Sequence, residues 1–479
     1  MMGPRHFRLL AAVAAMASPA TFSGSAQAEQ VILVDGERAQ RVDDPFVPSS
    51  AQVDLGPPPG STRAPAYPSS HGPRTVGRVL RQAQQSGAIT RPRYEDYRRS
   101  YGRARSTWRR LDGARKAELG YVLRSLERVA LARRMTPSRM PVMFLQLRRN
   151  SAYWSSKPFP AAGDEVAFRG SELLFRYFPG RGLQFHPLGN FKKANLLHGA
   201  CGQRGRGRPV CGARPPGPPG NAPCRPGRLR RLLDELSTLA VRRGGGFIAW
   251  EYMFDFGGGS PPWMSGMAQA TGIAALGKGA QLLNRPAYIE TAQAALGAFE
   301  ARAPLGVSTG GPLGGVHYLQ YSFAPRLYIF NAFLQSLIGL HDYGRLARDP
   351  RATSLFRRAE PEAQREVSHS DVGDWSRYSF RGRESTHEYH ELLREVLQGL
   401  GRRLGGIYCD YAIRYRGYQT QPPVIRFGGP PGAVARRDSR VSFTLSKLSL
   451  VELKIYKGDR LALRRLATFR RGSRSFGWR

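Results

Sequence analysis

The sequence is short of acidic residues: 35 Asp and Glu stand against 73 Lys and Arg, and the net charge is +38. Such a surface attracts polyanions, whether nucleic acid, anionic lipid or acidic polysaccharide. A coding bias toward Arg, Gly, Pro and Ala accounts for part of the excess, although the field acts on a polyanion whatever its origin. No segment approaches the roughly 18 apolar residues that span a bilayer, so we expect no membrane insertion of the mature protein.

Cysteine is also scarce, and its spacing argues against a metal site. The four cysteines have no CxxC spacing and no neighbouring His pair, and this pattern argues against a zinc site. Disulfides that staple a loop are the expected use, and the pairing stays open. The cysteines are Cys201, Cys211, Cys224 and Cys409.

Several catalytic signatures are missing. No G-x-G-x-x-G or Walker sequence follows a predicted strand, and neither HExxH nor G-x-S-x-G occurs. The nine histidines form no ligand cluster. We therefore predict a protein without cofactor or metal.

The first 28 residues have the pattern of a signal peptide. Arg5 and Arg8 precede the short apolar run Leu9–Ala17, and Ala26-Gln27-Ala28 supplies a small-residue cleavage site. We predict cleavage after Ala28 and an exported protein. Export favours an acidic glycan over nucleic acid as the partner of the positive surface.

Residues 29–100 are rich in Pro, Gly and Ser and have little periodicity, so we predict a largely disordered spacer that allows short ordered pieces. Residues 101–405 predict a helical domain, with a hairpin at Leu174–His186 and an irregular Gly/Pro/Arg loop at 200–227. Paired helices around an (α/α) toroid, or incomplete barrel, fit this succession, and composition equally allows another all-α packing. The helical spacing covers 116–130, 229–239, 265–283, 287–303, 329–344, 350–367 and 384–403.

After Gly405 the pattern changes to short β-like runs such as Val441–Leu445 and Leu450–Ile455. We predict that 406–479 form a small accessory β-sandwich, similar at its end to bacterial immunoglobulin-like modules. The expected fold class is therefore mainly α, with a C-terminal β module whose role is spacing, capping or glycan binding.

The residues that could carry chemistry lie between Trp250 and His390, where Tyr, Trp, Arg and amide side chains gather. Any one of these side chains, taken alone, more often serves in packing than in catalysis. Together they form an ordered set: Trp263–Gln269, Tyr318–Tyr321, Phe330–Phe333, Ser336–Leu340, Tyr378–Arg381 and Glu388–His390.

In that order and spacing the set resembles the C-terminal catalytic domain of the D-glucuronyl C5-epimerases. The family's segments are Trp-x-Ser-x-Met-Ala-Gln, Tyr-Glu-Glu-Tyr, Leu-Asn-Gly-Phe, Ser-Leu-Ile-Gly-Leu, Tyr-Asp-Leu-Arg and Asp-Tyr-His. The resemblance covers about 250–400 and implies an isomerase that inverts C5 of glucuronyl units in an acidic polysaccharide. A homodimer stays open.

That reaction removes a proton α to a carboxylate and returns one to the opposite face of the ring, so it needs two acid/base groups and a cation. The resemblance implies Tyr321 and Tyr378 as the opposed pair, Tyr389 as a third hydroxyl, and Arg381 as the clamp on the carboxylate. It also implies that the substrate is bound by Asn331, Gln320, Trp263, Gln269, Tyr318 and His390.

One departure from the family matters. Gln320 replaces the second Glu of Tyr-Glu-Glu-Tyr, and an amide can form hydrogen bonds but cannot act as a base. Two alternatives therefore stay open beside the epimerase: a catalytically silent protein that binds acidic glycans or the cell wall, and a polysaccharide lyase on the same toroid. A hydrolase would want a carboxylate pair, for which Glu251 and Asp255 are available without a supporting motif. The glycan itself is not specified by the sequence.

Overall fold

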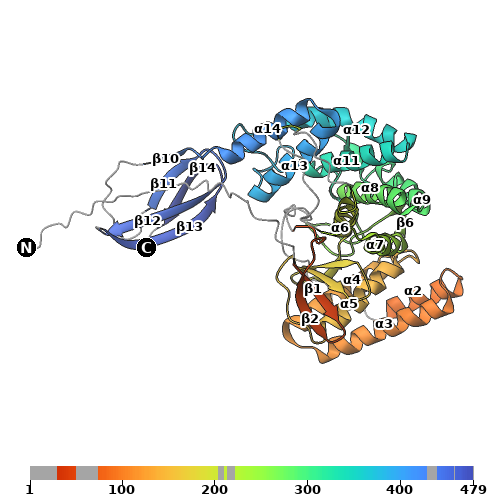
Figure 1. Ribbon diagram of the computed structural model, residues 1–479. Coiled ribbons are helices and arrows are strands. Elements are labelled where there is room, and N and C mark those ends of the chain that lie inside the picture. Colours follow the sequence, from red (N-terminus) through yellow and green to blue (C-terminus); the bar gives the residue numbers. More distant parts are fainter. Residues whose placement is uncertain are drawn as a thin grey trace, which may run out of the picture.

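The computed structural model describes residues 30–49, 74–202, 210–212, 222–428, 440–457 and 459–477. These residues are mainly helical, as the sequence predicts, and a continuous hydrophobic core runs through the N-terminal elements and the helices. Figure 1 shows the N-terminal elements at one end of the molecule, successive helices along an arc, and a projecting group of strands at the other end. The predicted signal peptide lies outside the described residues.

The N-terminal part combines a mixed sheet with helices. The strand order is β2-β1-β3-β4-β5, in which β1 and β3 are parallel and the other pairs are antiparallel. The strands are β1 (Gln30–Asp35), β2 (Arg38–Asp43), β3 (Glu165–Phe168), β4 (Leu174–Phe178) and β5 (Gly182–Phe185); the helices are α2 (Arg74–Gln85), α3 (Arg91–Arg110), α4 (Gly113–Leu131) and α5 (Met140–Trp154).

The hairpin predicted at Leu174–His186 is confirmed as β4 and β5. The described parts of 29–100 are not the expected disordered spacer, because they hold β1, β2, α2 and the first half of α3. β1 pairs with β3, more than a hundred residues away in sequence, and Val76 and Leu80 of α2 are buried in the core.

In the part of the chain that the structure describes, four helix pairs follow. The first members are α6 (Pro187–Gly199), α8 (Gly266–Leu283), α11 (Phe330–Leu346) and α13 (His387–Leu404), and each packs against the next in this order. The second members are α7 (Pro226–Thr238), α9 (Ala287–Ala295) with the short α10 (Gly297–Glu300), α12 (Pro350–His369) and α14 (Ile407–Thr420). We call α6, α8, α11 and α13 the first row. The short strands β6 (Val241–Arg242), β7 (Ile248–Ala249), β8 (Ser308–Gly310) and β9 (Val316–Tyr318) lie in the connections.

Side-chain caps explain where several of these helices begin. The Ser265 hydroxyl accepts a hydrogen bond from the Ala268 N–H at the start of α8, and Asp349 does the same for Ala352 at the start of α12. Four predicted helices are confirmed as α8, α11, α12 and α13; the predictions covered 265–283, 329–344, 350–367 and 384–403.

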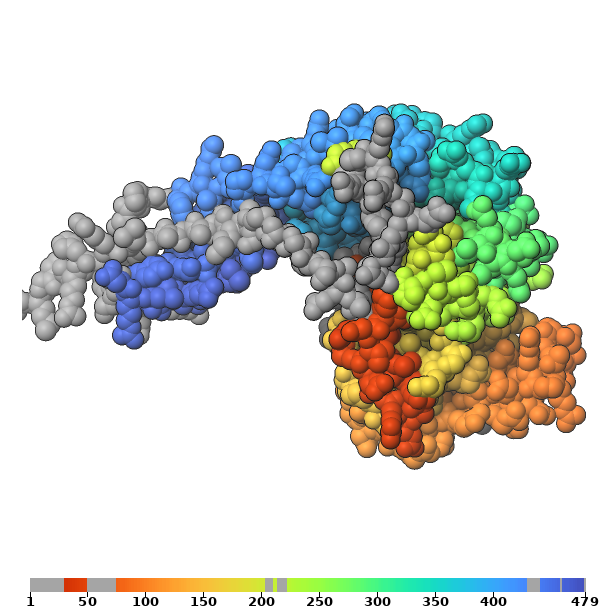
Figure 2. Space-filling view, viewed as in Figure 1, coloured from red at the N-terminus to blue at the C-terminus, as the bar shows by residue number. Residues whose placement is uncertain are grey.

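The β module starts later than the predicted residue 406, because 407–420 form helix α14. This helix has little amphipathic pattern in its sequence, and its buried residues are Tyr408, Ala412 and Tyr415. Beyond it, β10 (Ile425–Phe427), β11 (Arg440–Leu445) and β14 (Gly472–Gly477) form one sheet, and β12 (Ser449–Lys457) pairs with β13 (Arg460–Phe469) in another. Both sheets contribute to one small core. Figure 2 shows this module projecting beyond the helices.

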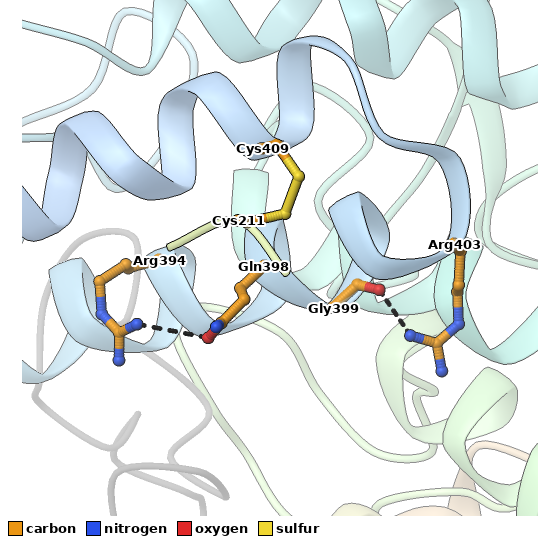
Figure 3. The surroundings of a disulfide bond; sticks show 6 residues. All are labelled: Cys211, Arg394, Gln398, Gly399, Arg403 and Cys409. Atoms are coloured by element: carbon orange, nitrogen blue, oxygen red, sulfur yellow. Dashed lines mark hydrogen bonds between the residues drawn. A yellow bond between two sulfur atoms is a disulfide. The ribbon is translucent and has the colours of Figure 1, made fainter. Parts of the chain in front are cut away.

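All four cysteines are paired. Cys201 bonds to Cys224, and Cys211 bonds to Cys409 at the start of α14. The second disulfide lies over α13 near Gln398 and Gly399, as Figure 3 shows. In the described part of the chain, no helix is long and apolar enough to cross a membrane.

Candidate active site

The segments singled out in the sequence meet at the amino ends of first-row helices. The residues before α8 run beside 319–322: the Gly266 N–H donates to the Leu319 carbonyl at 2.9 Å, and the Ser322 N–H donates to the Met264 carbonyl at 3.0 Å. The residues before α11 run beside the Tyr378 segment in the same way. There the Phe380 N–H donates to the Tyr328 carbonyl at 2.9 Å.

These amino ends have an electrostatic consequence. Helix dipoles place partial positive charge at the starts of α8, α11 and α13. Motif residues from three separate helix pairs thus lie at helix ends that favour a negatively charged ligand.

Tyr321 lies in an aromatic cluster. Its ring centroid is 5.7 Å from that of Trp263, 5.8 Å from that of Phe256 and 5.3 Å from that of Phe323, on which it stacks. Tyr321 is buried, whereas Phe323 is partly exposed and covers it.

Gln320 joins the same segment to α8. The Ser265 hydroxyl donates to Gln320 Oε1 at 3.0 Å, and the Gln320 side chain is buried. The amide thus fixes the Tyr321 segment to the capping residue of a helix, a task for which its oxygen needs no charge.

Tyr378, Tyr389 and Asn331 form a second group. The rings of Tyr378 and Tyr389 meet edge to face with centroids 4.9 Å apart. The Phe330 N–H donates to the Tyr378 carbonyl at 3.4 Å, which places this tyrosine beside the first turn of α11, where Asn331 lies. Tyr378 is partly exposed and Tyr389 is 7% exposed, so this group reaches the surface more readily than Tyr321.

Arg381 lies at the exposed end of the Tyr378 segment. Its backbone is left-handed, with φ of 55°, and its guanidinium lies 5.6 Å from the ring centroid of Phe380. An exposed cation in this place can approach an anionic ligand.

Trp263 and Gln269, which the resemblance implies as substrate-binding residues, have internal partners. The Trp263 ring stacks on Tyr252 with centroids 4.2 Å apart, and its indole N–H donates to the Phe254 carbonyl. The Gln269 amide bonds to both backbone groups of Trp250. Both side chains are buried, so they support the loop that precedes α8.

Tyr318 and His390 are buried as well. The Tyr318 hydroxyl donates to the Leu355 carbonyl at 2.8 Å. His390 Nε2 lies 3.1 Å from the Tyr415 carbonyl and Nδ1 lies 2.8 Å from the Ser376 hydroxyl, while the ring stacks on Trp375. Burial lowers the pKa of His390 to about 4, so the neutral ring donates from Nε2 and accepts at Nδ1. Both side chains are thus anchored by internal hydrogen bonds.

Sequence reasoning missed the contribution of the β4–β5 hairpin. Phe178 packs on Phe254 with centroids 4.7 Å apart, and His186 meets Tyr252 edge to face. Burial, with the nearby charge of Arg176, lowers the pKa of His186 well below its usual value. The hairpin itself was visible in the sequence, but no local pattern connects it to residues 250–323.

The two carboxylates considered for hydrolysis are held by arginines. Arg128 makes a bidentate ion pair with Asp255, with nitrogen-to-oxygen distances of 3.0 and 2.7 Å. Arg139 makes one with Glu251 at 2.7 and 2.9 Å, and Arg243 contacts the same carboxylate. Among the described residues, no group of three or more His, Cys, Asp or Glu side chains is placed to hold a metal ion.

Comparisons with known proteins match this region. Residues 244–416 fit the family described as D-glucuronyl C5-epimerase C-terminus. The D-glucuronyl C5-epimerase of Caenorhabditis elegans is 36% identical over 86 residues, which cover 18% of this chain and 14% of that protein. The chain thus matches only a small part of that relative's length.

Among solved structures, the endo-β-1,4-glucanase CMCax from Acetobacter xylinum aligns with 49% of this chain and 72% of its own, at 15% identity and a TM-score of 0.30. A score this low supports no conclusion about the fold.

Proposed function

Residues 244–416 belong to the C-terminal domain family of the D-glucuronyl C5-epimerases, and from this premise we propose that the chain inverts C5 of D-glucuronyl residues in an acidic polysaccharide. The observation that carries the proposal is the meeting of the motif segments at the amino ends of α8, α11 and α13. The net charge of +38 supports a polyanionic substrate.

We assign the proton transfers to tyrosines. One phenolate removes the C5 proton, and the electron pair of the broken C–H bond is delocalised into the uronate carboxylate as the enolate form. A phenol on the other face then donates its proton to C5. The configuration at C5 is thereby inverted without any change in oxidation state. Tyr321 and Tyr378 are the proposed pair, with Tyr389, in ring contact with Tyr378, as a third hydroxyl.

The polar residues have supporting roles. Arg381, exposed beside Tyr378, binds the carboxylate as its charge increases. Asn331 binds a sugar hydroxyl from the first turn of α11. Gln320 keeps the Tyr321 segment on Ser265 and takes no part in proton transfer.

The finer points of architecture and location are also proposals. The four helix pairs form an incomplete (α/α) toroid, the β10–β14 module is immunoglobulin-like, and residues 1–28 direct export. Two disulfides among the described residues support an oxidising compartment.

The test is incubation of the protein with a glucuronate polymer in heavy water, followed by mass and NMR detection of deuterium at C5. Tyr378→Phe is expected to lower the exchange rate roughly 10²–10⁴-fold. Tyr456→Phe, in the β module, is the matched control and leaves the rate unchanged. Absence of deuterium at C5 with several glucuronate polymers overturns the proposal, and unsaturated products that absorb in the ultraviolet identify a lyase instead.

The role of Gln320 has its own test. Gln320→Glu restores the family residue next to the Ser265 hydroxyl. If the amide only positions the segment, the exchange rate of this variant stays within about threefold of the parent; an increase of about 10²-fold shows that a carboxylate there transfers protons.

A further inference from the structure

A hollow of about 470 Å³ lies where α11 ends and α12 begins, away from the candidate active site. Its volume falls within the range of small-molecule sites. Asn331 and Gly344 are 13 positions apart on α11, so the hollow lies about 20 Å along this helix from the first-turn asparagine. The wall residues that matter chemically are Arg348, Asp349, Thr353, Ser354, Arg357 and Arg358.

Positive charge dominates this wall. Arg348, Arg357 and Arg358 are exposed, and within the described residues none of the three forms an ion pair with a carboxylate. Asp349 is already engaged: one oxygen accepts the Ala352 N–H at 2.8 Å and the other accepts from Gln293 at 3.2 Å.

A second carboxylate close to the wall forms an ion pair. Glu300, which lies within the electrostatic range of Arg358, is held by two of the three guanidinium nitrogens of Arg351 at 2.5 and 2.6 Å. Three arginines therefore line the hollow. Arg358 also forms a hydrogen bond with the buried Tyr318 side chain, and the two acidic neighbours have partners of their own.

Guanidinium groups bind carboxylate and sulfate oxygens through paired hydrogen bonds, and an exposed hydroxyl such as that of Ser354 suits a sugar. We propose that this hollow is a second glycan-binding site, which takes an anionic sugar unit of an acidic polysaccharide. The class of glycan rests on the proposed function, whereas the anion preference rests on the three arginines.

A long chain held here and at the active site would gain affinity, because the second contact becomes intramolecular. A short oligosaccharide that fills only the active site gains nothing. The hollow thus predicts a dependence on chain length that the active site alone does not explain.

The test is the double variant Arg348→Ala/Arg357→Ala, beside the control Arg98→Ala/Arg99→Ala on α3, whose two arginines are also exposed. Both changes remove the same charge. Binding is measured by calorimetry with a long polymer of glucuronate and N-acetylglucosamine, with a tetrasaccharide of the same units, and with a sulfated, carboxyl-reduced polymer.

The expected result is an affinity loss of about 10-fold for the long polymer in the hollow variant, a change of less than about twofold in the control, and no change for the tetrasaccharide. Loss with the carboxylate polymer identifies a uronate site, and loss confined to the sulfated polymer identifies a sulfate site. Equal losses in both variants, or none in either, overturn the proposal.

Binding and turnover separate the two proposals. If C5 exchange is absent but the hollow variant still loses affinity for the long polymer, the proposed function fails and the second site stands. If exchange occurs and both variants bind like the parent, the second site fails alone.

Discussion

Replacing Cys211 and Cys409 by serine removes a covalent link between residues 198 positions apart. In the loop-closure description, a loop of this length lowers the entropy of the unfolded chain enough to contribute about 5 kcal/mol at 25 °C. The Cys201–Cys224 link closes only 23 positions and contributes about 3 kcal/mol by the same relation.

These energies translate into melting temperatures. With an unfolding entropy of about 2.1 cal/mol/K per residue over a cooperative unit of about 300 residues, the long-loop variant should melt about 8 °C lower. The short-loop variant should melt about 5 °C lower. Differential scanning calorimetry of the oxidised parent and the two double variants measures both shifts.

The order of the two shifts is the decisive outcome. If the short-loop variant loses as much stability as the long-loop variant or more, closure of the unfolded chain is not the source of the stabilisation. A further check is the reduced parent, which should melt below either variant, because it lacks both links.

Two other predictions follow from close contacts and buried charge. A Cβ on Gly401 would clash with Cys211 Sγ, so Gly401→Ala should cost about 1–3 kcal/mol in the parent. The cost should be clearly less in a Cys211→Ser background, as a denaturation double-mutant cycle would reveal, and equal costs refute the contact. Burial alone would raise the pKa of Glu172, but hydrogen bonds from Arg228 and the charge and hydrogen bond of Lys193 hold it at about 2, below the usual 4.5. A depressed carboxyl pKa stabilises the fold above pH 4.5 and loses that effect as the pH falls toward 2. The full difference is about 3 kcal/mol, which solvent around the partly exposed Arg228 reduces to about 2. Urea titrations should therefore place Glu172→Gln about 2 kcal/mol below the parent at pH 7 and close to it near pH 2; a gap that is constant with pH refutes the charge account.

The helices α8, α11, α12 and α13 were predictable because their apolar residues recur at helical spacing. In α11, Phe333, Leu337 and Leu340 are all buried on one face. Helix α3 was missed although it is equally regular: its buried positions are Tyr97, Ser100, Tyr101 and Ala104, set among many arginines, and the helix has no Leu, Ile, Val, Met or Phe.

The sheet of the N-terminal part depends on contacts that no local pattern contains. β1 is held by β2 next to it and by β3, whose Val166 pairs with Ile32 across a long stretch of sequence. Proline and glycine around 56–60 dominate the composition of that region and concealed the strands.

Some features of the candidate site could likewise be predicted from the sequence, and others could not. The ordered motifs predicted which segments belong to the region, and the structure brings Tyr378 close to Tyr389 and Gln320 close to Ser265. They did not predict that Gln269 bonds to the backbone of Trp250, because that contact depends on how the chain between them turns.

The arrangement of the first row determines where the sequence of such a protein can vary. The loops that carry Trp263, Gln320 and Tyr378 lead into α8, α11 and α13, and each of these helices packs against its own partner in the pair. Residues of these loops can therefore be exchanged while the helices that support them keep their packing. Gln320, whose oxygen accepts a hydrogen bond from the neutral Ser265 hydroxyl, is one such position.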